Sequence, residues 1–284
     1  MAGDCCVPLL DSSEPVTTRM AYGYILEFFR RLGREPTLNE MEKDLHLGAD
    51  TVVGSLKSLE IQGLVRLDPV TSRIMDAYPY SAVPTRNRVL FEDGRRVYCM
   101  CAVDAFYVPF LTGSNVIISS RCFHCREEIK IGVERQIVSL ARPATAVVWN
   151  STAPYDCPKT NFFCSEEHLL QWRDNAPDEP GQIYSIDAAL DAGMRAARRI
   201  GLSTEGLNAI LWAGADELVC HCREVPKSTI IAAIARGAAS VEKIAAETTA
   251  CTGSWCKDTN PMKRCCRTEI ESLLEVYSGK GSFI

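Results

Sequence analysis

Fourteen cysteines in a 284-residue chain constrain this sequence more than any other feature. The chain is 46% hydrophobic and 24% charged, which is ordinary globular composition, so it can bury a core without disulfides to hold it. In a reducing compartment, thiols stay free and are kept for metal binding or catalysis. The cysteines are therefore the main clue to what the protein does.

The start of the chain indicates where the protein works. Asp4 precedes any basic residue and no long apolar run follows, which argues against a signal peptide and a membrane span. We therefore expect a cytoplasmic protein with no membrane partner. The formal net charge of -5 also gives no broad attraction to nucleic acid or anionic lipid.

Residues 1–80 have the pattern of a winged helix. Apolar spacing predicts helices over about 19–32, 37–45 and 49–62, and two short strands follow on either side of a turn at Asp68-Pro69. Such domains often bind DNA. Here eight Lys and Arg stand against twelve Asp and Glu, and the third helix offers only Lys57. We therefore expect a packing or lid role and no nucleic-acid partner.

Residues 81–200 carry the pattern of a catalytic core. Short β-branched runs recur from residue 88 to residue 150 and predict an antiparallel sheet, with helices near residues 101–111, 165–172 and 187–199. A linker over 201–216 leads to a cysteine-rich helical module over 217–284. The predicted fold class is α+β with three domains.

Two segments of this core place reactive groups together. Cys101 and Asp104 are three residues apart, which on a helix puts thiol and carboxylate on one face. Cys164 directly precedes a helix, whose free amides and dipole favour an anionic sulfur. Taken singly, each cysteine fits an ordinary buried thiol and Asp104 a capping carboxylate. The three together indicate a site.

These segments, with Tyr78-Pro79-Tyr80-Ser81 and Pro84-Thr85, resemble the alkylmercury (organomercurial) lyase family over roughly residues 19–200. The resemblance implies that Cys101, Asp104 and Cys164 are the catalytic residues and that Cys101 and Cys164 bind mercury. It also implies an N-terminal domain that shields the site. A soft metal held by two thiolates suits this chemistry, and Asp104 would supply the proton to the leaving carbon. The expected substrate is an organomercury compound, and the Hg(II) product would pass to small thiols or a mercuric reductase.

The other cysteines of the core receive no catalytic role from the sequence. Cys99 is interpreted as structural. Cys122 and Cys125 have zinc-knuckle spacing, but no second Cys-x-x-Cys pair completes a tetrahedral site, and Cys157 is a possible third ligand. Buried or loop thiols are the favoured interpretation. Lyases of the resembled family often have a cysteine where this chain has Ser165, so metal transfer is expected to differ.

From Leu218 onward the chain carries a second cysteine cluster. Four thiolates could converge at helix starts, as a [2Fe-2S] cluster requires, and structural zinc is the alternative. The segment resembles the [2Fe-2S] domain of bacterioferritin-associated ferredoxin and the related domain of certain copper chaperones, in its Cys-x-Cys, Thr252-Gly253 and Asn260-Pro261 motifs. That resemblance implies a cluster whose ligands are Cys220, Cys222, Cys256 and Cys266. Cys251 and Cys265 are adjacent reserves.

Two function hypotheses follow from the sequence. The first is an organomercurial lyase, and the second is a protein that binds, senses or transfers a soft metal without lyase activity. Asp104 separates them, because only a protonolysis enzyme needs a carboxylic acid beside the thiol.

Overall fold

The structure, a computed structural model, describes residues 10, 13–153, 157–199 and 209–278. By its internal contacts the chain divides into two compact units. The first unit consists of Met1–Ser12, Phe28–Pro36 and Lys57–Ser203, and the second of Ser13–Glu27, Thr37–Leu56 and Thr204–Ile284. The expected boundaries of three domains stay a prediction. The first half of the expected linker over 201–216 lies outside the described residues.

The first three helices occur where the apolar spacing predicts them. They are α1 (Val16–Leu32), α2 (Leu38–Leu45) and α3 (Ala49–Ile61), and Thr37 caps α2 in a reciprocal capping box with Glu40. The antiparallel pair β1 (Val65–Leu67) and β2 (Ile74–Ala77) follows, but β2 continues through β3 into a larger sheet rather than ending as a separate wing. The winged-helix arrangement stays a prediction.

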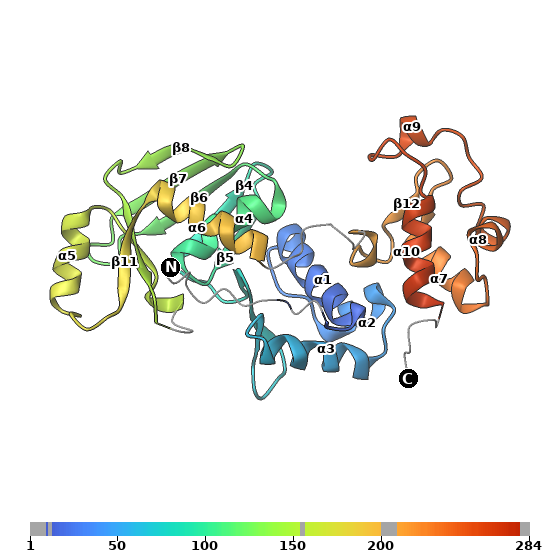
Figure 1. The fold of residues 1–284 in the computed structure, drawn as a ribbon, viewed down its shortest axis with the longest axis horizontal. Coiled ribbons are helices and arrows are strands. Elements are labelled where there is room, and N and C mark those ends of the chain that lie inside the picture. Colours follow the sequence, from blue (N-terminus) through green and yellow to red (C-terminus); the bar gives the residue numbers. More distant parts are fainter. Residues whose placement is uncertain (1–9, 11–12, 154–156, 200–208, 279–284) are drawn as a thin grey trace. The chain divides into compact units, whose positions relative to one another are not determined.

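The first unit is built around an antiparallel eight-stranded sheet, which confirms the predicted sheet core (Figure 1). Its strand order is β1-β2-β3-β5-β4-β6-β7-β8, so β5 lies between β3 and β4. The remaining strands are β3 (Tyr80–Ser81), β4 (Asn87–Phe91), β5 (Arg96–Cys99), β6 (Val116–Arg121), β7 (Glu128–Glu134) and β8 (Ile137–Arg142). This order depends on long-range pairing, such as Tyr80 opposite Cys99, which joins β3 to β5.

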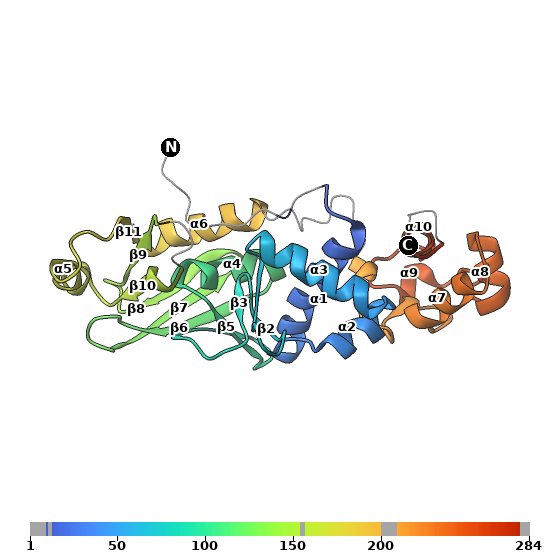
Figure 2. The same ribbon diagram turned by 90° about the horizontal axis from the view of Figure 1, so that it is seen from below.

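Two helices lie against one face of this sheet. α4 (Ala102–Thr112) is buried over residues 102–109 and lies between the sheet and α6 (Ile186–Arg199) (Figure 2). The two helices approach closely because Gly193 of α6 has no side chain, and a Cβ there would lie 2.6 Å from the carbonyl oxygen of Phe106. Apart from Asp104 and Thr112 the side chains of α4 are apolar, which agrees with the burial of residues 102–109.

A three-stranded sheet completes the first unit, in the order β10-β9-β11. It consists of β9 (Val147–Ser151), β10 (Asn161–Phe163) and β11 (Gly181–Ser185), and a short 3-10 turn, η1 (Cys157–Lys159), precedes β10. The helix α5 (Glu166–Asp174) follows β10 directly, with Ser165 as its N-cap. This junction positions Cys164 at the start of a helix, as predicted.

The C-terminal part of the second unit is mainly helical, as predicted. It contains η2 (Ala209–Leu211), the strand pair β12 (Leu218–Cys220) and β13 (Val225–Pro226), and four helices, α7 (Lys227–Ala235), α8 (Val241–Thr248), α9 (Cys256–Thr259) and α10 (Arg267–Tyr277). Apolar side chains of α7, α8 and α10, such as Ile230, Ile244 and Ile270, are fully buried. None of the helices in the described part of the chain is long and apolar enough to cross a membrane.

Candidate active site and metal centres

Cys101 and Asp104 meet at the first turn of α4. The Cys101 thiol accepts a hydrogen bond from the N–H of Asp104 at 3.4 Å, and the Asp104 carboxylate accepts one from the N–H of Cys101 at 3.0 Å. Both residues are buried, at 2% and 1% exposure. The sequence predicts that they share a helix face, whereas in the structure Cys101 precedes the helix as its N-cap, with φ of -139°. A reciprocal capping box therefore brings the thiol and the carboxylate together.

The surroundings of this pair are buried. Burial raises the pKa of the Cys99 thiol well above its ordinary value, and the charges of Asp104 and Cys101 add to this effect. Burial also raises the pKa of Tyr107, one turn along α4, and the charge of Asp104 contributes. Cys99 is therefore a protonated core thiol, which agrees with the structural role expected for it.

Cys164 lies in a second group of potential ligands. Its sulfur is 3.6 Å from the sulfur of Cys125 and 2.8 Å from Nδ1 of His168. The ligand atoms of Cys122, Cys125, Cys164 and His168 all lie within 4.8 Å of one another. In the part of the chain that the structure describes, Cys101, Asp104 and Cys164 form no such group of three.

The grouping brings two further potential ligands to Cys122 and Cys125, for which the sequence offers no second Cys-x-x-Cys pair. The missing half is Cys164 with His168, rather than a second Cys-x-x-Cys, and the Cys-x3-His spacing of that half is the sequence signal for it. The side chain of Cys157, the possible third ligand, lies outside the described residues. The two halves are far apart in the sequence, so only the fold brings them together.

Burial and local hydrogen bonds shift the pKa values of the thiols in this group. Burial alone would raise the pKa of Cys122, but backbone N–H groups of Cys125, Cys164 and His124 donate to its sulfur and lower the pKa to about 7. Burial raises the pKa of Cys164, and hydrogen bonds with Glu127 and the neighbouring thiols add to the rise. Of these two sulfurs, that of Cys122 therefore loses its proton more readily.

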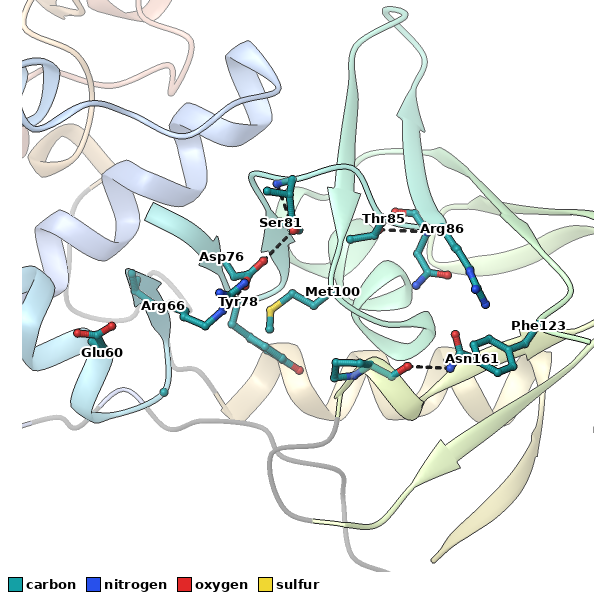
Figure 3. Close-up of a pocket in the computed structure, with 15 residues that line it drawn as sticks. Glu60, Arg66, Asp76, Tyr78, Ser81, Thr85, Arg86, Met100, Phe123 and Asn161 are labelled. Carbon is teal, nitrogen blue, oxygen red and sulfur yellow. Dashed lines mark hydrogen bonds and ion pairs between the residues drawn. The ribbon is translucent and has the colours of Figure 1, made fainter. Parts of the chain in front are cut away.

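A cavity of about 700 Å³ opens in the first unit, and its lining includes neighbours in sequence of the site residues (Figure 3). Tyr78, Met100, Phe123 and Asn161 line it, and the guanidinium of Arg86 lies 4.4 Å from the ring centre of Phe123. Met100 directly precedes Cys101 in the chain. On the opposite wall, Asn161 follows Thr160, whose carbonyl accepts a hydrogen bond from the N–H of Ala102 at 3.1 Å. The cavity therefore reaches the neighbourhood of the Cys101–Asp104 pair from two sides.

The C-terminal thiols also converge. The sulfur of Cys222 lies 3.7 Å from that of Cys220 and 3.8 Å from that of Cys256. The ligand atoms of Cys251, Cys265 and Cys266 lie within 4.8 Å of one another, and the N–H of Cys251 donates to the sulfur of Cys220. The expected ligands and both reserves therefore belong to one thiol-rich region.

Two further observations show how well this region suits a metal. A Cβ at Gly253 would lie 2.5 Å from the sulfur of Cys222, so the chain leaves room for that sulfur only because Gly253 has no side chain. Burial raises the pKa of Cys251 and of Cys256 to about 11, and the nearest thiols add to each rise. Metal binding there must release protons. The donor set of cysteines fits either an iron-sulfur cluster or zinc.

Comparison with known families assigns the two groups of cysteines to two different family models. Residues 80–198 match the family model described as alkylmercury lyase. Residues 218–276 match the model described as BFD-like [2Fe-2S] binding domain. Both resemblances expected from the sequence are therefore confirmed.

Curated relatives agree for the first of these regions. An alkylmercury lyase of Bacillus cereus is 32% identical over 109 residues, which is 36% of this chain and 49% of the relative. An alkylmercury lyase of Staphylococcus epidermidis is 29% identical over 130 residues, or 43% of this chain and 58% of the relative. The chain spans about half the length of the curated relatives it matches.

A solved structure supports the fold. The crystal structure of the mercury-bound form of MerB2 is similar with a TM-score of 0.55 and 22% sequence identity. The similarity covers 65% of this chain and 98% of that chain. The mixed helix and antiparallel-sheet architecture is therefore that of a known fold.

Proposed function

We propose that this protein is an organomercurial lyase, which cleaves carbon–mercury bonds by protonolysis to give a hydrocarbon and Hg(II). The observation that carries the proposal is the reciprocal hydrogen bonding of Cys101 and Asp104 at a buried helix start. It couples a soft-metal ligand to a carboxylate that can hold a proton. The pair lies within the segment that matches the lyase family model.

The proposed reaction uses two thiols and one carboxylate. An alkylmercury cation meets the thiols of Cys101 and Cys164, and each sulfur loses its proton as it binds mercury. Asp104 takes the proton of Cys101 and delivers it to the carbon. The carbon–mercury bond then breaks with its electron pair on carbon, so the products are the hydrocarbon, mercury held by two thiolates and one proton released to solvent.

Two features of the first unit support these roles, and a third sets a condition on them. The cavity presents the apolar side chains of Tyr78, Met100 and Phe123, beside charged ones such as Arg86, to the organic group. His168 lies 2.8 Å from the Cys164 sulfur and can accept its proton. Cys164 contacts Cys125 and His168, so the reaction requires its side chain to turn from that group toward the mercury bound by Cys101.

We also propose that Cys220, Cys222, Cys256 and Cys266 hold a [2Fe-2S] cluster. Two observations support this ligand set. The sulfur of Cys222 lies close to those of Cys220 and Cys256, and Gly253 leaves space for it. When bound, the cluster would supply one-electron transfer. Zinc is the competing occupant, and iron and acid-labile sulfide per chain distinguish the two.

The proposed setting is the cytoplasm, where thiols remain reduced. Small thiols or a mercuric reductase would then accept the Hg(II). A second candidate function is the binding or transfer of a soft metal without lyase activity. The grouping of Cys122, Cys125, Cys164 and His168 favours it, because these residues offer ligands and no proton donor for carbon.

The test compares wild type with Asp104→Asn in methylmercury and excess thiol without oxygen, following methane and Hg(II). Asparagine can still accept the hydrogen bond from the Cys101 N–H, so the helix cap is retained while the proton donor is lost. We expect the variant to retain mercury and to lose about 10²–10⁴-fold in methane production. If wild type retains mercury but releases no methane, the metal-binding function replaces the lyase.

A further inference from the structure

Four metal-ligating side chains come together from two separate segments of the first unit. Cys122 and Cys125 lie in the loop between β6 and β7, and Cys164 and His168 lie at the start of α5. Their ligand atoms all lie within 4.8 Å of one another. The lyase reaction proposed above uses Cys164, and it gives no role to Cys122 or Cys125.

Backbone hydrogen bonds hold the two segments together. The N–H of Phe123, inside the Cys-x-x-Cys loop, donates to the carbonyl of Phe162 in β10 at 2.9 Å. Cys164 follows Phe162 by two residues, so this single bond aligns the loop with the second pair of ligands. The loop is itself a tight turn, in which the N–H of Arg126 donates to the carbonyl of Cys122 at 3.0 Å.

The turn that carries Cys122 and Cys125 has a well-defined backbone conformation. Arg126 has φ of 71°, a left-handed conformation that costs a residue with a side chain about 1 kcal/mol. The turn is closed further by a hydrogen bond from the N–H of Cys122 to the carbonyl of Glu127 at 2.8 Å. In this turn the sulfurs of Cys122 and Cys125 lie within 4.8 Å of each other.

The donor set has the chemistry of a zinc site. Three sulfurs and one imidazole nitrogen form a common tetrahedral ligand set for Zn²⁺, and Zn–S bonds of about 2.3 Å require sulfurs about 3.8 Å apart. The sulfurs of Cys125 and Cys164 are 3.6 Å apart. The sulfur of Cys164 and Nδ1 of His168 are 2.8 Å apart, and a tetrahedral ion would hold them about 3.6 Å apart, so a rotation of the two side chains by about 0.8 Å admits it.

A second layer of contacts orients the ligands. The hydroxyl of Thr145 donates to the carbonyl of Cys164 at 2.8 Å, and the hydroxyl of Ser165 accepts from the N–H of His168 at 3.2 Å. The ring of His124 lies 5.1 Å from that of His168 and outside the ligand group. Cys125 is exposed and His168 half-buried, so an ion has a path from solvent.

We propose that Cys122, Cys125, Cys164 and His168 form a tetrahedral zinc site in the resting protein. Binding replaces the protons of three thiols with one Zn²⁺ held by three thiolates and a neutral imidazole, and three protons leave to solvent. The site joins the β6–β7 loop to the start of α5. It goes beyond the proposed lyase activity and does not depend on it.

The test is the zinc content of the full-length chain, purified without oxygen after growth with zinc and measured by elemental analysis. The variant is Cys125→Ser with His168→Ala, which removes one exposed and one half-buried ligand and no core side chain. The control is Cys99→Ala with His124→Ala, which also removes one thiol and one imidazole and in addition tests the loss of a core thiol, since Cys99 is buried. We expect the control to keep the zinc content of wild type and the ligand variant to hold about one zinc ion fewer per chain. Equal zinc content in the two variants would overturn the proposal.

Zinc K-edge spectroscopy of wild type keeps the test decisive if the ligand variant fails to fold. We expect a first shell of three sulfurs and one nitrogen, and a shell of four sulfurs alone would place the zinc in the C-terminal module and overturn the proposal. The methylmercury assay separates the two hypotheses. Zinc in the purified protein, with no methane production even after a chelator has removed the zinc, retains this site and rejects the lyase, and methane production by protein that never holds zinc does the reverse.

Discussion

The thiol of Cys164 lies 2.8 Å from Nδ1 of His168, one helical turn further along the chain. This contact links the two proposed uses of Cys164. As a zinc ligand, Cys164 is a thiolate beside a neutral imidazole, and as a mercury ligand it must give up its proton to a base. Cys164 is a ligand in both proposals, so zinc and mercury compete for its sulfur.

We therefore predict that Hg(II) releases zinc from the resting protein. Mercury is the softer ion and prefers thiolate over imidazole, so its binding to Cys164 removes one of the four zinc ligands. A chromogenic zinc chelator should report about one zinc ion released per chain as Hg(II) is added. The Cys125→Ser, His168→Ala variant should release none from this site, and full zinc retention by wild type under saturating Hg(II) would contradict the shared-ligand arrangement.

Substitution of Cys101 should abolish most of the methane production, whereas substitution of the nearby Cys99 should leave it nearly unchanged. Cys101→Ser removes the thiol that pairs with Asp104, so we expect methane production to fall by at least about 10²-fold. Cys99→Ala is the matched control, because burial raises the pKa of Cys99 and keeps it a neutral core thiol. It should retain turnover within about threefold and lose about 1–2 kcal/mol of stability through the small cavity it leaves. Equal loss of turnover in both variants would show that the site does not distinguish these thiols.

Gly253→Ala should prevent assembly of the C-terminal metal centre. A Cβ at this position would lie 2.5 Å from the sulfur of Cys222, so either the sulfur or the backbone must move. We expect iron per chain to fall at least about tenfold, as measured with visible absorption. Gly54→Ala in α3 is the control, because a Cβ there meets nothing within 4 Å and alanine favours a helix. Normal iron content in Gly253→Ala would remove Cys222 from the ligand set.

Lys227 should make the stability of the second unit depend on pH. It is fully buried and donates to the carbonyls of Leu211 and Ala213 at 2.9 and 2.8 Å. Burial lowers its pKa to about 7, although the charge of Asp44 opposes this shift. Between pH 7 and the ordinary lysine value of about 10.4, the unfolded chain binds more protons than the folded chain, so stability rises with pH in that window. Below pH 7 both states are protonated and the contribution is constant.

The measurement is chemical denaturation of wild type and Lys227→Met at pH 7 and pH 8.5. Wild type should gain about 1–2 kcal/mol relative to the variant over this interval, because the variant has no group to titrate. Comparison of the two proteins cancels the titration of the cysteines. Parallel pH profiles would show that Lys227 keeps its ordinary pKa despite burial.

Local sequence signals were sufficient where one segment determines the structure by itself. The helices α1 to α3, the caps at Thr37 and Ser165 and the β-branched strands β6 to β9 all follow from spacing and side-chain type over a few residues. The approach of Cys101 to Asp104 also follows from their spacing, although a capping box rather than a shared helix face achieves it. The motifs of the lyase-like core and the ferredoxin-like module are local too, and both were identified from the sequence.

The tertiary structure alone decided how distant segments pair. β5 lies between β3 and β4, and Gly193 packs against the backbone of Phe106. Both arrangements depend on contacts between residues far apart in the chain. The partners of Cys164 were missed for the same reason. Cys122 and Cys125 meet Cys164 and His168 only because Phe123 bonds to Phe162 and aligns a hairpin loop with a helix start some 40 residues later. Spacing within either segment carries no information about that alignment, since it is fixed by backbone hydrogen bonds that form only when the sheets and helices have packed.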